Sequence, residues 1–562
     1  MQKHWRQRLW ELTPRFLTSR SIPISLVCRS SLAYLKRFYH HSFLYRWMLP
    51  NQADPMVSAA VRNLWIGDEK NGAAIKNGAF AFGSIETSYP NLWQQQNIPE
   101  YFWSYFHGFG WLQDIKSAPD DQTTIVEQII NDWISRHPVG HGLAWDIDIT
   151  ARRLDAWINY LDSSPTMRTT DAFANFVLHL KKHWFHLYNN LPGPLFGSTL
   201  ILSVKSLLKG WLLLSEQLPM PDYFFKRFSQ ELQQQFLSTE SYAERNPSAQ
   251  LMLLAHLIDL STAFRENNQA VPDIWQESIV KLAKTIFYIQ RPDSGLPGFN
   301  GSNREESWHV QQILSESRLN ALELFSNVPV HLSGYCRLQA GKSVVLLDTG
   351  LLPDVPYDAS MHAGALSFEF YAGSDAIIVN CGSSPNPIWH DVQRATAAHS
   401  TLIMNDTNSS FLGRNHGVIK GPQLIKCQRQ EENGNWWLEA SHDGYQKLFG
   451  ATHTRLLYLS HDGFDLRGED ILESKIGHRC VVRFHLHPDT LVKLEPSQQT
   501  AILKVPSGQS WQLRTMIGNI DAEESVYLGP NGIIHKSQQL VIGNLPTDPN
   551  LKIKWALTRK ES

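Results

Sequence analysis

Imidazole side chains gather in the second half of the sequence, where extended strands are expected. The run Arg483-Phe484-His485-Leu486-His487 places its polar side chains on one face of a strand and its apolar side chains on the other. Two histidines two residues apart on a strand can share a metal ion or an anionic ligand. The alternative is a polar face that is solvated or hydrogen-bonded within the protein. His485 is therefore a candidate substrate-binding residue.

Four other side chains near these strands are candidates for proton transfer. His362 and His399 flank two expected strands, with Asn380 between them in the sequence, and His442 lies with Tyr445 in a turn. Imidazole and phenol groups act as general acids and bases when a substrate proton lies within hydrogen-bond reach. We therefore predict catalytic roles for His362, His399, His442 and Tyr445.

The first half of the chain offers groups that suit an acidic sugar. Arg245 and Asn246 precede an expected helix, and Arg152 lies within another. A guanidinium binds a carboxylate through two parallel hydrogen bonds, which makes Arg245 a candidate carboxylate clamp. Trp145 is a candidate platform for a sugar ring. The alternative for each arginine is a salt bridge between helices, and the alternative for Trp145 is packing in the core.

Helices are expected to position these groups in the first half. Residues 150–161 carry apolar side chains at helical spacing, with Thr150 as the predicted N-cap. Residues 199–214 are apolar almost all round, which predicts a helix buried between others. A series of helices without strands predicts an all-α layer, either a solenoid or a closed toroid. Further amphipathic runs lie at 172–188, 221–237, 248–264 and 273–290.

After about residue 330 the period of apolar residues changes from 3.6 to 2. Because no long helical pattern intervenes, the strands should form antiparallel sheets in a sandwich or a barrel. We therefore expect a basic N-terminal arm at 1–50, an all-α domain at 51–326 and an all-β domain at 334–562. Strand-like runs lie at 343–348, 366–371, 376–380, 400–404, 435–440, 453–459 and 480–486.

Composition excludes several classes of protein. The 562 residues are 42% hydrophobic and 19% charged, which permits large cores. Lys and Arg number 51 against 53 Asp and Glu, so a chain-wide basic surface for nucleic acid is excluded. No apolar run approaches the roughly 18 residues of a membrane span. The five cysteines are scattered and include no C-x-x-C pair, which argues against a disulfide scaffold or a thiolate zinc site.

The first 49 residues carry nine lysines and arginines against one acidic residue, Glu11. Their interleaved aromatic residues suit peripheral contact with an anionic membrane surface. The alternative is a helical hairpin packed on the main body. The apolar stretch at 21–27 is too short and too polar for a secretory signal peptide, so none is predicted.

Residues 358–401 resemble the second domain of heparinase II/III-type polysaccharide lyases. The family pattern is a His-x-His-Ala-Asp run leading into a Leu-Ser-Phe-Glu strand, then a strand ending in Asp-x-Gly and a Thr-Ala-x-His-Asn/Ser-Thr turn. The resemblance continues at 441–455 and 483–488. It is looser in the helical half, at His107-Gly108-Phe109-Gly110-Trp111, around 145–157 and at Arg245-Asn246-Pro247, and it covers roughly residues 60–560.

The resemblance implies an (α/α) toroid followed by an antiparallel β-sandwich. It also implies β-elimination on a uronate-containing polysaccharide, which makes an acidic polysaccharide the expected partner. Such a reaction needs a group that neutralises the uronate carboxylate, a base for the C5 proton and an acid for the leaving oxygen. Family members use a toroid Asn, a toroid Tyr and a sandwich His. The expected compartment is the cell envelope or periplasm, and the cytoplasm is the alternative because no signal peptide is seen.

The chain departs from the family pattern at each of these places. Ser360 stands where the first His of His-x-His is expected, and Asn380 replaces the Asp. Ser198-Thr199 replaces the toroid Asn-His, and Ala249 replaces the toroid Tyr. Two functions therefore stay open: a divergent lyase, and a non-catalytic relative that binds glycan during envelope or exopolysaccharide assembly or turnover. The remaining histidines favour the first, and the replaced residues favour the second.

The resemblance also places a structural zinc at His362, Asn380 and His399. Zinc prefers imidazole, thiolate and carboxylate ligands, so two imidazoles and a neutral amide predict a poor site. We expect well under one zinc per chain and no other cofactor. The alternative is a hydrogen-bonded cluster that joins two strands.

Overall fold

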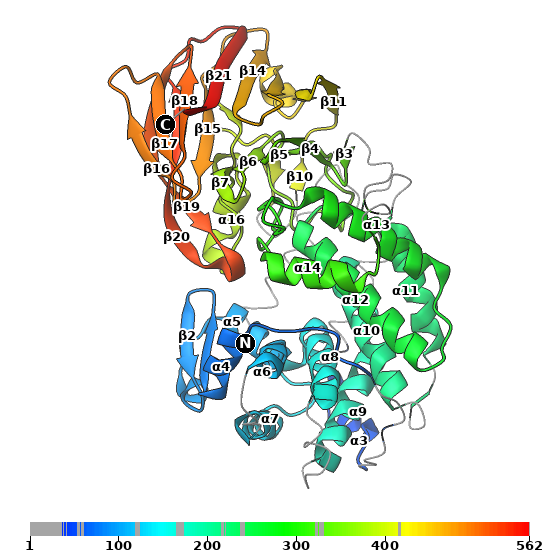
Figure 1. Ribbon diagram of the computed structural model, residues 1–562. Coiled ribbons are helices and arrows are strands. Elements are labelled where there is room, and N and C mark those ends of the chain that lie inside the picture. Colours follow the sequence, from blue (N-terminus) through cyan, green and yellow to red (C-terminus); the bar gives the residue numbers. More distant parts are fainter. Residues whose placement is uncertain are drawn as a thin grey trace. The chain divides into compact units, whose positions relative to one another are not determined.

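Helices dominate the first part of the chain, and antiparallel sheets dominate the second (Figure 1). Contacts define two compact units, a helical unit within Ile22–Phe236 and Met252–Val280 and a sheet unit within Leu237–Leu251 and Lys281–Ser562. The three domain boundaries expected from the sequence stay predictions. The computed structural model describes residues 36, 39–40, 42–52, 57, 61–118, 124–163, 173–214, 218–219, 221–236, 242–320, 324, 331–413 and 418–560.

Each helical run expected from the sequence is a helix. Helix α8 packs against α5, α6, α9 and α10, and α10 is buried along nearly its whole length, as its apolar sequence predicts. Among the described residues, no helix is both long enough and apolar enough to cross a bilayer. A hairpin of β1 (Ala79–Phe82) and β2 (Ile85–Ser88) was not expected. The helices are α3 (Phe43–Met48), α4 (Glu69–Lys76), α5 (Glu100–Gly108), α6 (Leu112–Ser117), α7 (Thr124–Arg136), α8 (Ile147–Ser163), α9 (Phe173–Asn190), α10 (Gly197–Leu213), α11 (Asp222–Gln235), α12 (Pro247–Glu266), α13 (Asp273–Ile289) and α14 (Ser307–Glu316).

The predicted cap at Thr150 is wrong. Helix α8 begins at Ile147, and the Thr150 N–H donates to the carbonyl of Asp146 at 2.8 Å, within the first turn. Thr150 is fully buried. The apolar period of this helix starts later than its hydrogen bonding, so the pattern marked the start too late.

A buried ion network joins three helices of the helical unit. Lys205 on α10 lies 2.9 Å from Asp155 on α8 and 2.6 Å from Asp259 on α12, and Lys209 lies 2.8 Å from Asp259. Burial alone would raise the pKa of Asp155, but the two ammonium groups outweigh it and hold that pKa well below its usual range. Buried charges cost several kcal/mol each unless they are paired. The network therefore fixes which faces of α8, α10 and α12 meet.

Replacing Lys209 with methionine should lower the free energy of unfolding by about 3–5 kcal/mol, because Asp259 loses one of its two buried partners. Chemical denaturation measures the change. Lys70→Met, at an exposed position of α4, is the control and should change stability little. Equal stability of the two variants would show that the network contributes nothing to folding.

In the described β region, the short strands β9 (Phe411–Leu412) and β10 (Val418–Lys420) pair with each other, and two large antiparallel sheets contain the other strands, as the sequence predicts. One has the strand order β11 (Ile425–Glu432), β12 (Asn435–His442), β13 (Thr452–Leu459), β14 (Asp465–Glu473), β21 (Asn550–Lys560), β18 (Ser510–Thr515), β17 (Thr500–Lys504) and β16 (Leu491–Leu494). The other has the order β19 (Asn519–Leu528), β20 (Ile534–Gly543), β15 (Cys480–Leu486), β7 (Asp375–Val379), β6 (Phe368–Ala372), β5 (Ser343–Asp348), β4 (Tyr335–Ala340) and β3 (His331–Leu332), and β8 (Leu402–Met404) also pairs with β15.

Side chains from both sheets share one apolar core, which makes the β region a sandwich. Phe370 of β6 meets Trp511 of β18 with ring centroids 5.3 Å apart, and Phe368 stacks on Trp555 of β21 at 5.7 Å. Phe484 of β15 lies in the same core, on the face that the alternation of its strand predicts. The sheet that contains β11 and β12 exposes its other face, whereas β5 and β6 of the second sheet are buried at every position.

Candidate active site

The Arg245 guanidinium is the centre of a polar cluster in the sheet unit. Its side chain forms an ion pair with Asp348 at the end of β5 and donates to the carbonyls of Gly334 and Gly350, both at 2.9 Å. A Cβ at either glycine would come within 2.3 Å of the guanidinium, so the loops close on it only where no side chain intervenes. Burial opposes the charge of Arg245, but Asp348 outweighs it and raises the pKa of the guanidinium.

Asn300 connects this ion pair to the main chain of His362. Its Nδ2 donates to Asp348 Oδ2 at 2.8 Å and to the Tyr335 hydroxyl at 2.9 Å, and its Oδ1 accepts the His362 N–H at 3.3 Å. Asn300 has a positive φ of 49°, a conformation that asparagine tolerates better than most residues. The ion pair thus helps to hold His362 in place.

The hydrogen bonds of two imidazoles determine where their protons lie. His399 Nδ1 faces the carbonyl of Ala395 at 2.8 Å, and a carbonyl only accepts, so this nitrogen carries the proton. In neutral His399 the Nε2 is then bare, and it accepts from His362 Nδ1 at 3.1 Å. Burial lowers the pKa of both rings and keeps them neutral near pH 7. His362 Nε2 is therefore unprotonated.

Asn246 and Ser360 lie beside Gly301, which adjoins Asn300. A Cβ built on Gly301 would lie 3.1 Å from both Asn246 Nδ2 and Ser360 Cβ. Asn246 Oδ1 accepts the N–H groups of Ser248 and Ala249 at 2.9 and 3.2 Å, which caps α12. The hydrogen-bond donor Nδ2 is thereby left for another partner, and among the described residues it has none. Arg245, Asn246 and His362 thus lie around Asn300 and Gly301, and their roles as site residues stay predictions.

A buried carboxylate beneath the site was missed in the sequence. Glu369 on β6 pairs with Arg304 at 2.9 Å, and it accepts the N–H of Asn380 at 3.1 Å. Arg304 also donates to the Asn380 carbonyl at 2.7 Å. Burial opposes ionisation of Glu369, but Arg304 outweighs it and lowers the pKa of the carboxyl. The signal in the sequence was one charged residue among apolar residues in the run that forms β6. The structure shows that this strand is buried at every position, so its carboxylate needs a partner.

The residues at the implied zinc position do not fit a zinc ion. Only His362 and His399 offer nitrogen ligands. Their facing nitrogens, His362 Nδ1 and His399 Nε2, lie 3.1 Å apart and are joined by a hydrogen bond. The Asn380 oxygen already accepts the N–H of Ser400 at 2.9 Å. In the described part of the chain, no three His, Cys, Asp or Glu side chains converge as metal ligands. The low zinc content expected from the sequence stays a prediction, and we assign zinc no step.

His442 and Tyr445 lie in the sandwich core and not in the cluster around His362. His442 Nδ1 accepts the N–H of Gly444 at 3.0 Å, so its Nε2 donates to His453 Nδ1 at 3.2 Å, and His453 Nε2 donates to Asp470 at 2.7 Å. Both His442 and Tyr445 are buried, at 2% and 0% exposure. This relay stabilises the core, and it gives a polysaccharide no access to either predicted catalytic residue.

Of the other predicted substrate-binding residues, His485 lies close to His399, and Arg152 and Trp145 belong to the helical unit. His485 is 3% exposed and uses both ring nitrogens in internal hydrogen bonds, which matches the hydrogen-bonded alternative. Arg152 belongs to the helical unit, where it pairs with Asp148 at 3.2 Å. Trp145 is 3% exposed and stacks on His183 with centroids 4.6 Å apart, so no ring face is left for a sugar. Core packing describes Trp145 better than a sugar platform.

Comparisons with known proteins agree with this architecture. Residues 327–556 match the family model "Heparinase II/III-like, C-terminal". A crystal structure of heparinase III superposes with a TM-score of 0.69 at 13% identity, covering 97% of this chain and 93% of that one. The heparan sulfate lyase HepC from Pedobacter heparinus gives 0.55 at 12% identity, covering 88% and 83%.

One curated relative also matches most of the chain. It is "FtsZ-localized protein C" from Caulobacter vibrioides (strain NA1000 / CB15N), which is 26% identical over 475 residues and 81% covered in both chains. The predicted resemblance to heparinase II/III-type lyases is confirmed by the family match at residues 327–556 and by the similarity to the heparinase III structure. The fold is accordingly a helical toroid followed by an antiparallel β-sandwich.

Replacing Arg245 with alanine should lower the free energy of unfolding by about 3–5 kcal/mol, because Asp348 would stay buried without its charged partner. Arg152→Ala is the control, since its half-exposed pair with Asp148 is worth at most about 1 kcal/mol. Chemical denaturation measures both. An Arg245→Ala protein of unchanged stability that no longer binds glycan would instead identify Arg245 as a carboxylate clamp.

Stability should fall as the pH drops below about 6.5, partly because of His485. Burial lowers the pKa of His485 to about 3, so between these values the unfolded state binds a proton that the folded state does not. The free energy of unfolding then decreases by at most about 1.4 kcal/mol per pH unit for this group. His485→Gln should flatten the slope between pH 6.5 and 5, measured by denaturation at each pH. The same flattening in His461→Gln, at an exposed turn, would contradict this assignment.

Proposed function

We propose that this protein is a polysaccharide lyase that cleaves a uronate-containing glycan by β-elimination, with His362 as the base. The supporting observation is a pair of consecutive hydrogen bonds, from His399 to the Ala395 carbonyl and from His362 to His399. Together they leave His362 Nε2 unprotonated. A base that is oriented by a second group is the usual arrangement for proton transfer in enzymes. The confirmed lyase fold is consistent with this role.

The reaction divides its tasks between two side chains, Asn246 and His362. Asn246 Nδ2 donates to the uronate carboxylate, on which charge grows as the C5 proton leaves. His362 Nε2 takes that proton, the electron pair forms the C4–C5 double bond, and the C4–O bond breaks. The imidazolium then returns its proton to the leaving oxygen, which requires the oxygen and the C5 proton on the same face of the ring. Burial lowers the pKa of His362, so the base is available at neutral pH but weak, and slow turnover is expected.

A second candidate function is glycan binding without turnover, in envelope or exopolysaccharide assembly. Ser198-Thr199, Ala249 and Ser360 stand where the resemblance implies catalytic residues, and Arg245 is fully engaged within the protein. The curated relative is named for its localisation with FtsZ and not for a lyase activity. These observations favour a binding role at the same site.

The compartment and a membrane contact belong to the same proposal. The resemblance suggests the cell envelope, the cytoplasm is the alternative, and the name of the curated relative records localisation with FtsZ. Residues 1–35 of the basic arm lie outside the described residues. In α3, Phe43 and Trp47 are 79% and 75% exposed, while Tyr45 is buried and hydrogen-bonds His186 at 2.6 Å. This pattern suits both a peripheral membrane contact and a helix packed on the main body.

The purified protein should release unsaturated uronate from at least one member of a panel of uronate polysaccharides, seen as rising ultraviolet absorbance. His362→Gln should reduce the rate by about 10²-fold or more, which is the usual contribution of a general base. His487→Gln is the matched control, since this partly buried histidine lies outside the cluster.

The position of the base can be tested further with His399→Gln. This variant should lower kcat more than it raises KM, because it disturbs the orientation of His362 and not the binding of the glycan. If the panel binds but no unsaturated product forms with the wild-type protein, the binding function replaces the lyase. Equal rates for wild-type protein and His362→Gln would remove His362 as the base.

A further inference from the structure

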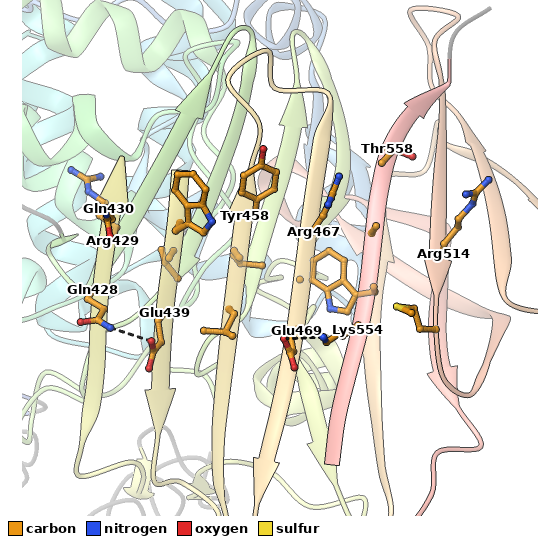
Figure 2. Close-up of a pocket in the computed structure, with 18 residues that line it drawn as sticks. Gln428, Arg429, Gln430, Glu439, Tyr458, Arg467, Glu469, Arg514, Lys554 and Thr558 are labelled. Atoms are coloured by element: carbon orange, nitrogen blue, oxygen red, sulfur yellow. Dashed lines mark hydrogen bonds and ion pairs between the residues drawn. The ribbon is translucent and has the colours of Figure 1, made fainter. Parts of the chain in front are cut away.

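A second polar surface lies on the outer face of the sheet that contains β11–β14. An open groove of about 900 Å³ crosses this face over strands β11, β12, β13, β14, β21 and β18 (Figure 2). Side chains that point outward from neighbouring strands stand beside one another in two rows. With strands about 4.8 Å apart, each row is roughly 24 Å long. The groove is therefore long enough for an extended polymer.

Strand register defines both rows. In the first row each residue is paired directly with the next across the sheet, and the second row lies two residues further along the strands. The first row consists of Gln430, Trp437, Tyr458, Arg467, Ala556 and Arg514. The second row consists of Gln428, Glu439, Leu456, Glu469, Lys554 and Met516.

Two aromatic rings in the first row offer flat apolar surfaces among polar groups. Trp437 is 40% exposed, and its ring centroid lies 5.3 Å from that of Tyr458 on the next strand. The Arg467 guanidinium lies 5.6 Å from the centre of the Tyr458 ring. Sugar rings combine an apolar face with a hydroxyl rim, so exposed aromatic rings with polar neighbours suit them. In Figure 2 the side chains of Tyr458 and Arg467 rise from adjacent strands.

One cation of the groove is left for an anionic ligand. The carboxylates of the two rows already have partners, since Glu439 accepts from Gln428 at 3.1 Å and Glu469 lies 3.9 Å from Lys554. Arg467 pairs with Asp465, and Arg429 donates to the Arg337 carbonyl at 2.6 Å. Within the described ranges, the Arg514 guanidinium has no hydrogen bond or ion pair.

We propose that this groove binds an acidic polysaccharide lengthwise across the strands, as a glycan site separate from the cluster around His362. Trp437 and Tyr458 stack on sugar rings, and Arg514 pairs with a uronate carboxylate or a sulfate, which the planar guanidinium fits. The proposal holds whether or not His362 catalyses β-elimination, because the groove lies on the opposite sheet of the sandwich from the strands that follow His362. A protein partner is the occupant that the test must exclude.

Binding of the full chain to polygalacturonate, hyaluronate and heparan sulfate can be measured by affinity electrophoresis, with neutral dextran as the control polymer. The His362→Gln background prevents cleavage of the probes. In that background, Trp437→Ala and Arg514→Gln should each weaken binding to at least one acidic polymer about five- to tenfold. The matched controls Tyr223→Ala on α11 and Arg479→Gln, both at well-exposed side chains outside the groove, should bind as the parent does.

The outcomes separate this proposal from the proposed lyase function. Binding that depends on Trp437 and Arg514 supports the groove even if the wild-type protein releases no unsaturated product. Turnover with binding that is insensitive to both substitutions would overturn the groove and leave the lyase standing. Equal binding to dextran, or no binding to any acidic polymer, would also overturn it and would leave a protein partner as the occupant. Unchanged melting temperatures of the two variants show that loss of binding is not loss of folding.

Discussion

The ion pair between Arg245 and Asp348 is the contact on which the candidate site depends. The guanidinium of Arg245, a residue that is 6% exposed, must find acceptors within the protein, and here four carbonyl groups and a carboxylate supply them. Those acceptors come from loops that must close tightly, which two glycines permit. Asp348 also accepts a hydrogen bond from Asn300, and Asn300 in turn accepts the N–H of His362. The ion pair is thereby connected to the backbone of His362. An arginine that the sequence suggests for a substrate thus serves to build the site.

Two histidine relays in the sandwich show how surroundings decide what an imidazole can do. In both, a main-chain group fixes one ring nitrogen and thereby the protons of the next ring. The relay from His442 ends on Asp470 within the core, where every ring nitrogen has a partner. The relay from His399 ends on His362, whose Nε2 has no partner among the described residues. An open end, and not a perturbed pKa alone, distinguishes a candidate base from a structural histidine.

Periodicity was sufficient to predict the architecture, because helices and strands bury apolar residues at fixed intervals. It predicted α8–α13 and the antiparallel sandwich, and the resemblance brought His362 and His399 together. It could not predict the partners of buried charges, since Glu369 and Arg304 lie 65 residues apart and meet only in the folded chain. Nor could it predict that Trp145 packs in the core, because a sequence does not reveal whether an aromatic ring faces a core or a cleft. The interior position of Thr150 likewise depended on hydrogen bonds that the apolar pattern does not record.

The chain combines a heparinase III-like fold with replacements at positions where the resemblance implies catalytic residues. The central claim is that His362 Nε2 faces the reacting carbon of a uronate. A crystal structure of the His362→Gln protein with a uronate oligosaccharide tests this claim most directly. The account predicts that C5 of one uronate lies about 3–3.5 Å from the side-chain atom that replaces Nε2, with its carboxylate on Asn246 Nδ2. An oligosaccharide bound elsewhere, with no uronate between Asn246 and residue 362, would contradict it.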